Sequence, residues 1–186
     1  NLLPKIAQQM ARNAGVNLSQ YSHLIYFFPR TNSCPWGALG DLGGNPGSIW
    51  LNGVNTGPVT AHEMGHNLGL YHAHALDCQG AVNTGSCAEL DVGDYGDTMG
   101  SMSVYDGPHF NAYEKEHIGW LNTAASPPIL TVTTSGTYTI DAYETLNQNI
   151  KALKIKKAQA QYAADYYYIE FRQGIGFDSK MAACTD

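Results

Sequence analysis

Apolar and polar residues follow periods that predict helices in some segments of the chain and strands in others. Ile6 and Met10 share one face of a helix that Gly15 ends, whereas the apolar run LIYFF is typical of a buried strand. Asn111 and Glu114 form a capping box at the start of another helix. The expected elements are a helix over residues 3–13, strands over 21–28 and 48–52, a helix that begins at Pro58, and a helix over 111–118.

The pattern changes after Pro127. The segments ILTVTTSGTYTIDAY, NIKALKIKK and DYYYIEFR are rich in β-branched and aromatic residues, and period-two alternation is clearest around Ile169. We expect three or four strands here. The predicted fold class is α+β, with a first domain over residues 1–125 and a small β-rich C-terminal region over 126–186.

Composition and charge narrow the possible partners and the compartment. A net charge of −6 argues against nucleic acid or an anionic membrane as the main partner, and the apolar runs are too short to span a bilayer. The chain starts at Asn1 without a signal-type segment, so we expect a mature chain from which a targeting segment has been removed. Four cysteines suit two disulfides and a secreted protein.

The cysteine spacing favours one pairing among three possible connectivities. Cys78 and Cys87 bracket a short polar loop and are the favoured pair, which leaves Cys34 with Cys184. A zinc site built from cysteines is not expected, because the sequence contains no C-x-x-C pair.

The segment AHEMGHNLGLYH contains three of the seven histidines of the chain. His62 and His66 are one helical turn apart and project from the same face. His72 can join them only if the chain turns after His66, and Gly69 permits that turn through the left-handed conformation. Three imidazoles around zinc leave a fourth position open for water, which is typical of a catalytic site. Glu63 follows His62 directly and can reach that water as the general base.

The motif H-E-x-x-H-x-x-G-x-x-H is the metzincin signature, which is accompanied by a methionine turn downstream. The run YGDTMGSM supplies such a turn, with Met99 as the first choice for the residue beneath the metal and Met102 as the second. Together with HFNAYEKEHIGWL and YYIEFRQGIGFDS, it makes the chain resemble the gametolysin family of extracellular metalloproteases, and more loosely the immune inhibitor A-type peptidases. The resemblance extends from Tyr21 to Ser179.

This resemblance implies a metzincin-like catalytic domain, in which a mixed sheet carries a long metal-binding helix, followed by β-structure. In such relatives the β-structure continues beyond a segment like GFDS, so we expect the C-terminal region to be truncated. It also implies an edge strand above the cleft, for which SIWLN is our choice, that pairs with extended substrate.

Further site candidates come from the same resemblance and from the residues themselves. Tyr105 is a candidate for stabilising the oxyanion, with a packing role as the alternative. His74 and His109 are candidates for lining the cleft, with a surface or hydrogen-bonding role as the alternative. The acidic run over residues 91–97 is a candidate Ca²⁺ site, and a turn-rich loop is the alternative reading.

The expected function is that of a secreted zinc endopeptidase acting on protein or peptide substrates. In this reading His62, His66 and His72 hold one zinc ion and Glu63 is the general base. Two alternatives remain open: a zinc hydrolase of a non-peptide substrate, and a binding or adhesion module with an inactive metal site. The presence of Glu63 argues against the second, because a structural site has no use for that carboxylate. The oligomeric state is not readable from the sequence.

Overall fold

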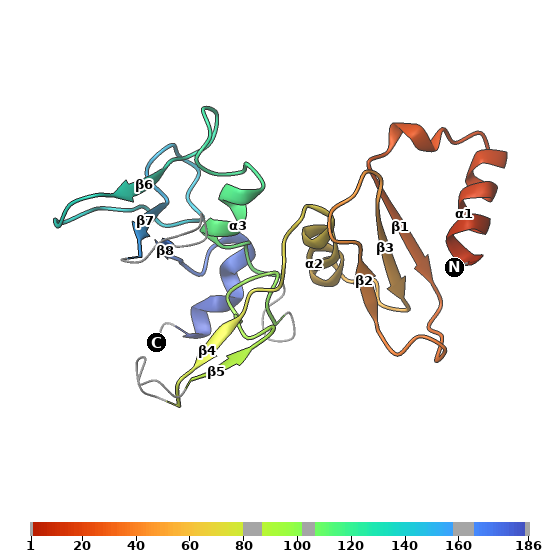
Figure 1. Ribbon diagram of the computed structural model, residues 1–186, viewed down its shortest axis with the longest axis horizontal. Helices are drawn as coiled ribbons and strands as arrows, with labels where there is room; N and C mark the ends of the chain where they lie inside the picture. The colour runs from red at the N-terminus through yellow and green to blue at the C-terminus, as the bar shows by residue number, and fades with distance from the viewer. Residues whose placement is uncertain (1, 80–86, 102–106, 158–165, 185–186) are drawn as a thin grey trace. The chain divides into compact units, whose positions relative to one another are not determined.

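The computed structural model describes residues 2–79, 87–101, 107–157 and 166–184 (Figure 1). The fold is mixed α/β, with several small sheets and few helices among these residues. Packing divides the chain into two compact units, residues 1–72 and residues 73–186, which we call unit 1 and unit 2. The domain boundary expected at residue 125 falls inside unit 2, so a separate domain after that point stays a proposal.

Unit 1 contains two helices and a three-stranded sheet. Its elements are α1 (Leu2–Asn13), a 3-10 turn η1 (Leu18–Gln20), β1 (His23–Phe28), β2 (Ala38–Gly40), β3 (Gly47–Asn52) and α2 (Gly57–Asn67). The sheet order is β1-β3-β2, with β3 parallel to β1 and antiparallel to β2. The two predicted strands and both predicted helices of this unit are confirmed.

The prediction that SIWLN forms the edge strand is wrong. This segment lies in β3, which is the central strand, and the two edges are β1 and the short strand β2. The sequence pattern did not predict β2, because this strand has only three residues and lies in a glycine-rich stretch that is typical of a loop. A strand that pairs on both sides cannot accept a substrate at its edge.

Helix α2 packs against β2 and β3. Ile49 and Leu51 of β3 are almost completely buried, as expected for alternate residues on the packed face of a strand. Asn67, the last residue of α2, is also buried, and its Nδ2 donates to the carbonyl oxygens of Asp41 (2.9 Å) and Ser48 (3.1 Å). The C-terminal end of α2 is therefore held on the sheet by hydrogen bonds as well as by apolar packing.

Unit 2 contains two small sheets and one short α-helix among its described residues. Its elements are β4 (Ala75–Asp77), β5 (Ala88–Leu90), α3 (Ala112–His117), β6 (Ile129–Val132), β7 (Ala152–Lys156), β8 (Tyr166–Glu170) and a 3-10 helix η2 (Gly176–Cys184). Strands β4 and β5 form an antiparallel pair, and β6, β7 and β8 form a sheet in that order. In the described part of the chain after Pro127, the β-rich pattern therefore corresponds to three strands. The β4–β5 pair lies in a stretch whose sequence shows no periodic pattern.

The predicted bond between Cys78 and Cys87 is confirmed, and it links the two strands β4 and β5 just beyond their paired residues. The predicted bond between Cys34 and Cys184 is not formed. Cys34 is a free cysteine in the structure, and the side chain of Cys184 is outside the described ones.

The core of unit 2 lies between α3 and one face of the β6–β8 sheet. Its buried apolar residues are Ala112, Leu121, Ile129, Tyr143 and Ala152. Asn111 caps α3 as predicted, because its Oδ1 accepts a hydrogen bond from the Glu114 backbone N–H (2.9 Å). The Glu114 side chain does not complete a capping box. Instead it is buried beside the carboxyl of Asp97.

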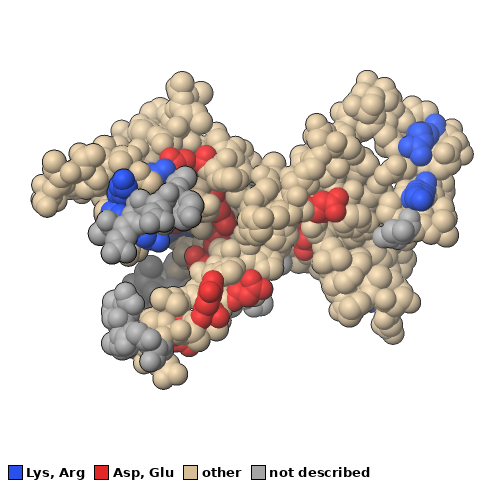
Figure 2. Space-filling model, viewed as in Figure 1, with Lys and Arg blue, Asp and Glu red and all other residues tan. Residues whose placement is uncertain are grey.

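The two units differ in charge. Of the 16 acidic residues in the chain, only Asp41 and Glu63 belong to unit 1. Figure 2 shows acidic side chains on the visible face of unit 2. No helix in the described part of the chain is long and apolar enough to cross a membrane.

Candidate metal centre

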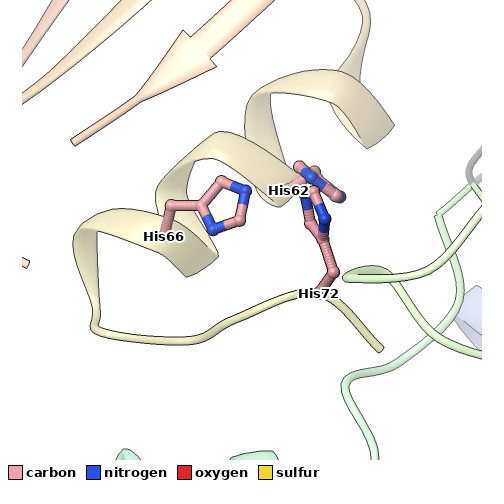
Figure 3. Close-up of side chains that lie close together, drawn as sticks. All are labelled: His62, His66 and His72. Atoms are coloured by element: carbon pink, nitrogen blue, oxygen red, sulfur yellow. The ribbon is translucent and has the colours of Figure 1, made fainter. Parts of the chain in front are cut away.

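The three histidines of the AHEMGHNLGLYH segment come together in unit 1. His62 and His66 extend from α2, and His72 extends from the chain that follows the helix (Figure 3). Each residue offers one ring nitrogen, and these nitrogens lie within 4.8 Å of one another. Two imidazoles on one zinc ion have nitrogens roughly 3 Å apart, since Zn–N bonds are about 2 Å long. Small side-chain movements would therefore bring all three nitrogens onto one ion.

A tight turn after α2 returns the chain to the helix. Gly69 has a φ of 93°, in the left-handed region, and its N–H donates to the carbonyl of His66 (2.9 Å). The N–H of Leu70 donates to the carbonyl of Gly65 (3.0 Å). These two bonds form a Schellman motif, which closes a helix and reverses the chain. The predicted role of Gly69 is confirmed.

The same turn sets the orientation and the protonation of one histidine. His66 Nδ1 lies 2.8 Å from the Leu70 carbonyl oxygen, which can only accept, so Nδ1 carries the proton. Burial lowers the pKa of His66 and favours the neutral ring. A neutral imidazole whose Nδ1 donates to a carbonyl presents Nε2 as a ligand, which is the usual arrangement of a metal-binding histidine. The donor set therefore fits a zinc ion.

Glu63 is buried next to the histidines, and burial raises the pKa of its carboxyl to about 7. A cation held by the neighbouring rings would favour the ionised form and lower this pKa. Strand β2 approaches Glu63 closely. A Cβ atom placed on Gly40 would lie 2.6 Å from the Glu63 carbonyl oxygen and 3.1 Å from its Oε2. The edge strand therefore runs directly beside the carboxylate, and only glycine fits at that point.

The family model for gametolysin peptidase M11 matches residues 3–184, nearly the whole chain. The chain belongs to the gametolysin family of peptidases. It is therefore a metallopeptidase, and its substrates are proteins or peptides. The resemblance to this family that the sequence indicated is confirmed. Comparisons with curated proteins and with solved structures give no match.

The remaining site candidates of this gametolysin-family chain lie in unit 2. Met99 is completely buried, and its N–H donates to Asp97 Oδ1 (2.6 Å). Tyr105 and Met102 lie outside the described residues. His74 is partly exposed between two carboxylates, with Nδ1 2.5 Å from Glu89 Oε1 and Nε2 3.2 Å from an Asp91 oxygen.

The acidic run over residues 91–97 does not gather metal ligands in the described structure. Asp94 Oδ1 accepts from the Gly96 N–H, and both oxygens of Asp97 accept from backbone N–H groups, those of Met99 and Asn111. Within the described residues, the three histidines are the only group of three or more His, Cys, Asp or Glu that could hold a metal. The structure therefore offers no support for the calcium site.

Sequence reasoning missed two residues that shape the centre, Gly40 and Asn67. A glycine in a strand is a general sign of close backbone approach, and this sign marks Gly40 once β2 is known. Asn67 gives no comparable signal, because its carbonyl partners are distant in the sequence.

Proposed function

We propose that the protein is a secreted zinc endopeptidase that hydrolyses internal peptide bonds of proteins. The observation that carries the proposal is the convergence of His62, His66 and His72 beside the buried carboxyl of Glu63, in a chain of a metallopeptidase family. The disulfide between Cys78 and Cys87 supports an extracellular location.

The three histidines would hold zinc through neutral ring nitrogens. When bound, zinc supplies an acidified water and polarises the carbonyl of the scissile bond. Glu63 accepts the proton of the attacking water and passes it to the nitrogen of the leaving amine. The Leu70 carbonyl keeps the His66 ring in the tautomer that this role requires.

The edge strand β2 is the proposed binding surface for the substrate backbone. In the described sheet β2 has a neighbour on one side only, so an extended peptide can pair with its other side. Gly40 at the end of β2 adjoins Glu63. A peptide paired along β2 would therefore pass beside the general base.

Three further assignments complete the proposal. Met99 lies beneath the metal, Tyr105 stabilises the oxyanion, and residues 1–125 form the catalytic domain. The first is supported by the complete burial of Met99 in a hydrogen-bonded turn, the second by the resemblance to the family, and the third by the change in the residue pattern after Pro127.

The first test compares Glu63→Gln with the parent enzyme on a denatured protein substrate. Loss of a general base typically costs about 10²–10⁴ in rate, so we expect cleavage to fall by that factor while about one zinc per chain remains bound. A zinc chelator should abolish cleavage by the parent. Fragments are mapped by mass spectrometry and zinc by metal analysis. Parent-like proteolysis by a zinc-loaded Glu63→Gln protein would contradict the mechanism.

A second variant separates metal binding from base catalysis. His72→Ala removes a ligand and should lose zinc together with activity, whereas His117→Ala, at the exposed end of α3, should keep both. A parent that binds zinc but cleaves no protein would favour a non-peptide hydrolase. Unchanged activity in both Glu63→Gln and His72→Ala would exclude this centre as the active site.

A further inference from the structure

Unit 2 contains a cavity of about 570 Å³ that takes no part in the proposed reaction. Its apolar wall consists of Trp120, Leu121, Pro127, Tyr143 and Leu146. Cavities of this size with apolar walls and a few polar groups are the usual sites for small ligands and peptide side chains. The polar groups therefore indicate which ligand the cavity can accept.

Two of the polar groups are lysines without a carboxylate partner. Among the described residues, neither Lys115 nor Lys151 forms an ion pair within 4.0 Å. Lys151 is almost completely buried, and the acceptors of its Nζ within the described residues are neutral oxygens of Ala142 and Thr145. Buried charges are normally paired with an opposite charge. Neither lysine therefore has a carboxylate in direct contact, although the carboxylates of Asp178, Glu170 and Glu144 act on Lys115 from a longer distance.

Lys115 is the lysine whose ammonium has hydrogen-bond donors that the described residues leave unused. Its Nζ lies 2.9 Å from His109 Nδ1 and 4.2 Å from the centre of the Tyr143 ring. Burial lowers the pKa of His109 to about 4, so the ring is neutral and its Nδ1 accepts. Burial, together with the Arg172 guanidinium, lowers the pKa of Lys115 to about 8, so the amine is still mainly protonated at pH 7. An ammonium has three donors, and the described residues supply one acceptor.

The one acidic residue that lines the cavity, Glu144, forms no ion pair within 4.0 Å with either lysine among the described residues. Glu144 Oε2 accepts from the Gln173 N–H (3.0 Å), and its carboxyl shares a hydrogen bond with the carboxyl of Asp178. Burial raises the pKa of Glu144, which favours the neutral acid. The carboxyl of Glu144 is therefore engaged by the Gln173 N–H and by Asp178 rather than by either lysine.

We propose that this cavity binds a carboxylate that is attached to an apolar group, with the carboxylate on Lys115 and the apolar group against Trp120 and Leu121. The C-terminus of a peptide that ends in an apolar residue has this chemistry, and so has a small aromatic acid. The site is independent of the histidine centre, and its test does not depend on peptidase activity.

The experiment measures the affinity of the full chain for three probes by calorimetry or by NMR. N-acetyl-phenylalanine carries the carboxylate, N-acetyl-phenylalaninamide lacks the charge, and 3-phenylpropionate lacks the amide group. A hydrogen bond between charged groups corresponds to roughly 10- to 100-fold in affinity, so we expect the acid to bind more tightly than the amide by that factor. Tighter binding of the acetylated acid than of 3-phenylpropionate identifies the ligand as a peptide end, and the reverse identifies a small acid.

Two pairs of variants locate the binding site. Lys115→Met should abolish the preference for the acid, whereas Lys156→Met, at an exposed lysine outside the cavity, should keep it. Leu146 is fully exposed at the cavity, so its substitution should not disturb folding. Leu146→Asp should weaken binding of the acid by repulsion, and the neutral Leu146→Asn should not.

Two results would overturn the proposal. One is equal affinity of the parent for the acid and the amide. The other is a preference for the acid that survives both Lys115→Met and Leu146→Asp, because such binding would take place elsewhere, for example at a zinc ion held by the histidines.

Discussion

At the scale of single residues, the position of the third histidine depends on one backbone conformation. Gly69 adopts a φ of 93°, and the two hydrogen bonds of the Schellman motif form only with that geometry. His72 lies three residues further along, so any change in the turn moves its ring relative to His62 and His66. The ligand set is thus as sensitive to Gly69 as to the histidines themselves.

Gly69→Ala tests this dependence. A Cβ in the left-handed conformation costs roughly 1–2 kcal/mol, so we expect a loss of stability of about that size and a weaker affinity for zinc. Urea unfolding and zinc titration provide the two measurements. The control is Gly57→Ala at the start of α2, where a Cβ would meet no atom within 4 Å. Equal effects of the two substitutions would show that the turn does not position His72.

At the scale of elements, the contact between β2 and α2 determines the distance from the edge strand to the general base. Gly40 lies at that contact, because a Cβ there would collide with the backbone of Glu63. The obstacle is a carbonyl oxygen and cannot rotate away as a flexible side chain would. A larger residue at this position must therefore displace the strand or the helix.

We expect Gly40→Ala to reduce cleavage more than it reduces stability, because the strand moves away from Glu63 while the sheet persists. Small displacements of positioning groups can cost about 10²-fold in rate. Gly37→Ala, where a Cβ would make only ordinary contacts with Val54 and Arg30, should leave cleavage nearly unchanged. Peptidase rates and thermal unfolding of both variants are the measurements. Normal cleavage by Gly40→Ala would argue against substrate binding along β2.

Helix α3 is joined to the preceding turn through a pair of buried carboxyls. Asp97 accepts hydrogen bonds from Met99 and Asn111, and Glu114 of α3 shares a hydrogen bond with Asp97. Burial, and secondly the charge of Asp97, raises the pKa of Glu114 from 4.5 to about 10. The pair therefore holds a proton that the unfolded chain would release.

This proton makes the stability of unit 2 depend on pH. The folded pKa of Glu114 is above the unfolded value, so its contribution is fully present below about pH 4.5 and is lost as the pH rises towards 10. Glu114→Gln cannot ionise and still offers a donor to Asp97. We expect this variant to lose less stability than the parent between about pH 5 and pH 9 in thermal unfolding. The stability of the exposed Glu89→Gln variant should change with pH as that of the parent does. If the unfolding temperature fell equally with pH in all three proteins, the shared proton would be refuted.

At the scale of the whole molecule, all three candidate metal ligands belong to unit 1, whereas the disulfide belongs to unit 2. A ligand that binds only the folded state stabilises that state by mass action, by about 4 kcal/mol when it is present at a thousand times its dissociation constant. A disulfide that closes a loop of about ten residues contributes roughly 2–3 kcal/mol. The two kinds of stabilisation should therefore act on different units.

Calorimetry of the chain with and without a zinc chelator tests this division. We expect chelation to lower the unfolding temperature of one transition, and Cys87→Ser to lower that of another. The two perturbations should be additive, because residues without shared partners rarely couple. A single transition that responds equally to both would show that the two units unfold together.

The features that were predictable from the sequence are those that depend on neighbouring residues. The spacing of His62 and His66, the turn at Gly69 and the cap at Asn111 each involve hydrogen bonds or side chains within a few residues. The disulfide between Cys78 and Cys87 also closes over a short separation. Local geometry fixes such features whatever surrounds them, so pattern and spacing are sufficient evidence.

Only the tertiary structure decided which strand is at the edge, what Asn67 binds and where the Glu114 side chain lies. Strand order depends on hydrogen bonds between segments distant in the sequence, and the three-residue β2 has no periodic pattern of its own. Lys115 and Lys151 likewise read as ordinary surface lysines until folding places them in one cavity without a carboxylate partner among the described residues. Burial and charge balance are sums over all neighbours in space, and a one-dimensional pattern does not contain that sum.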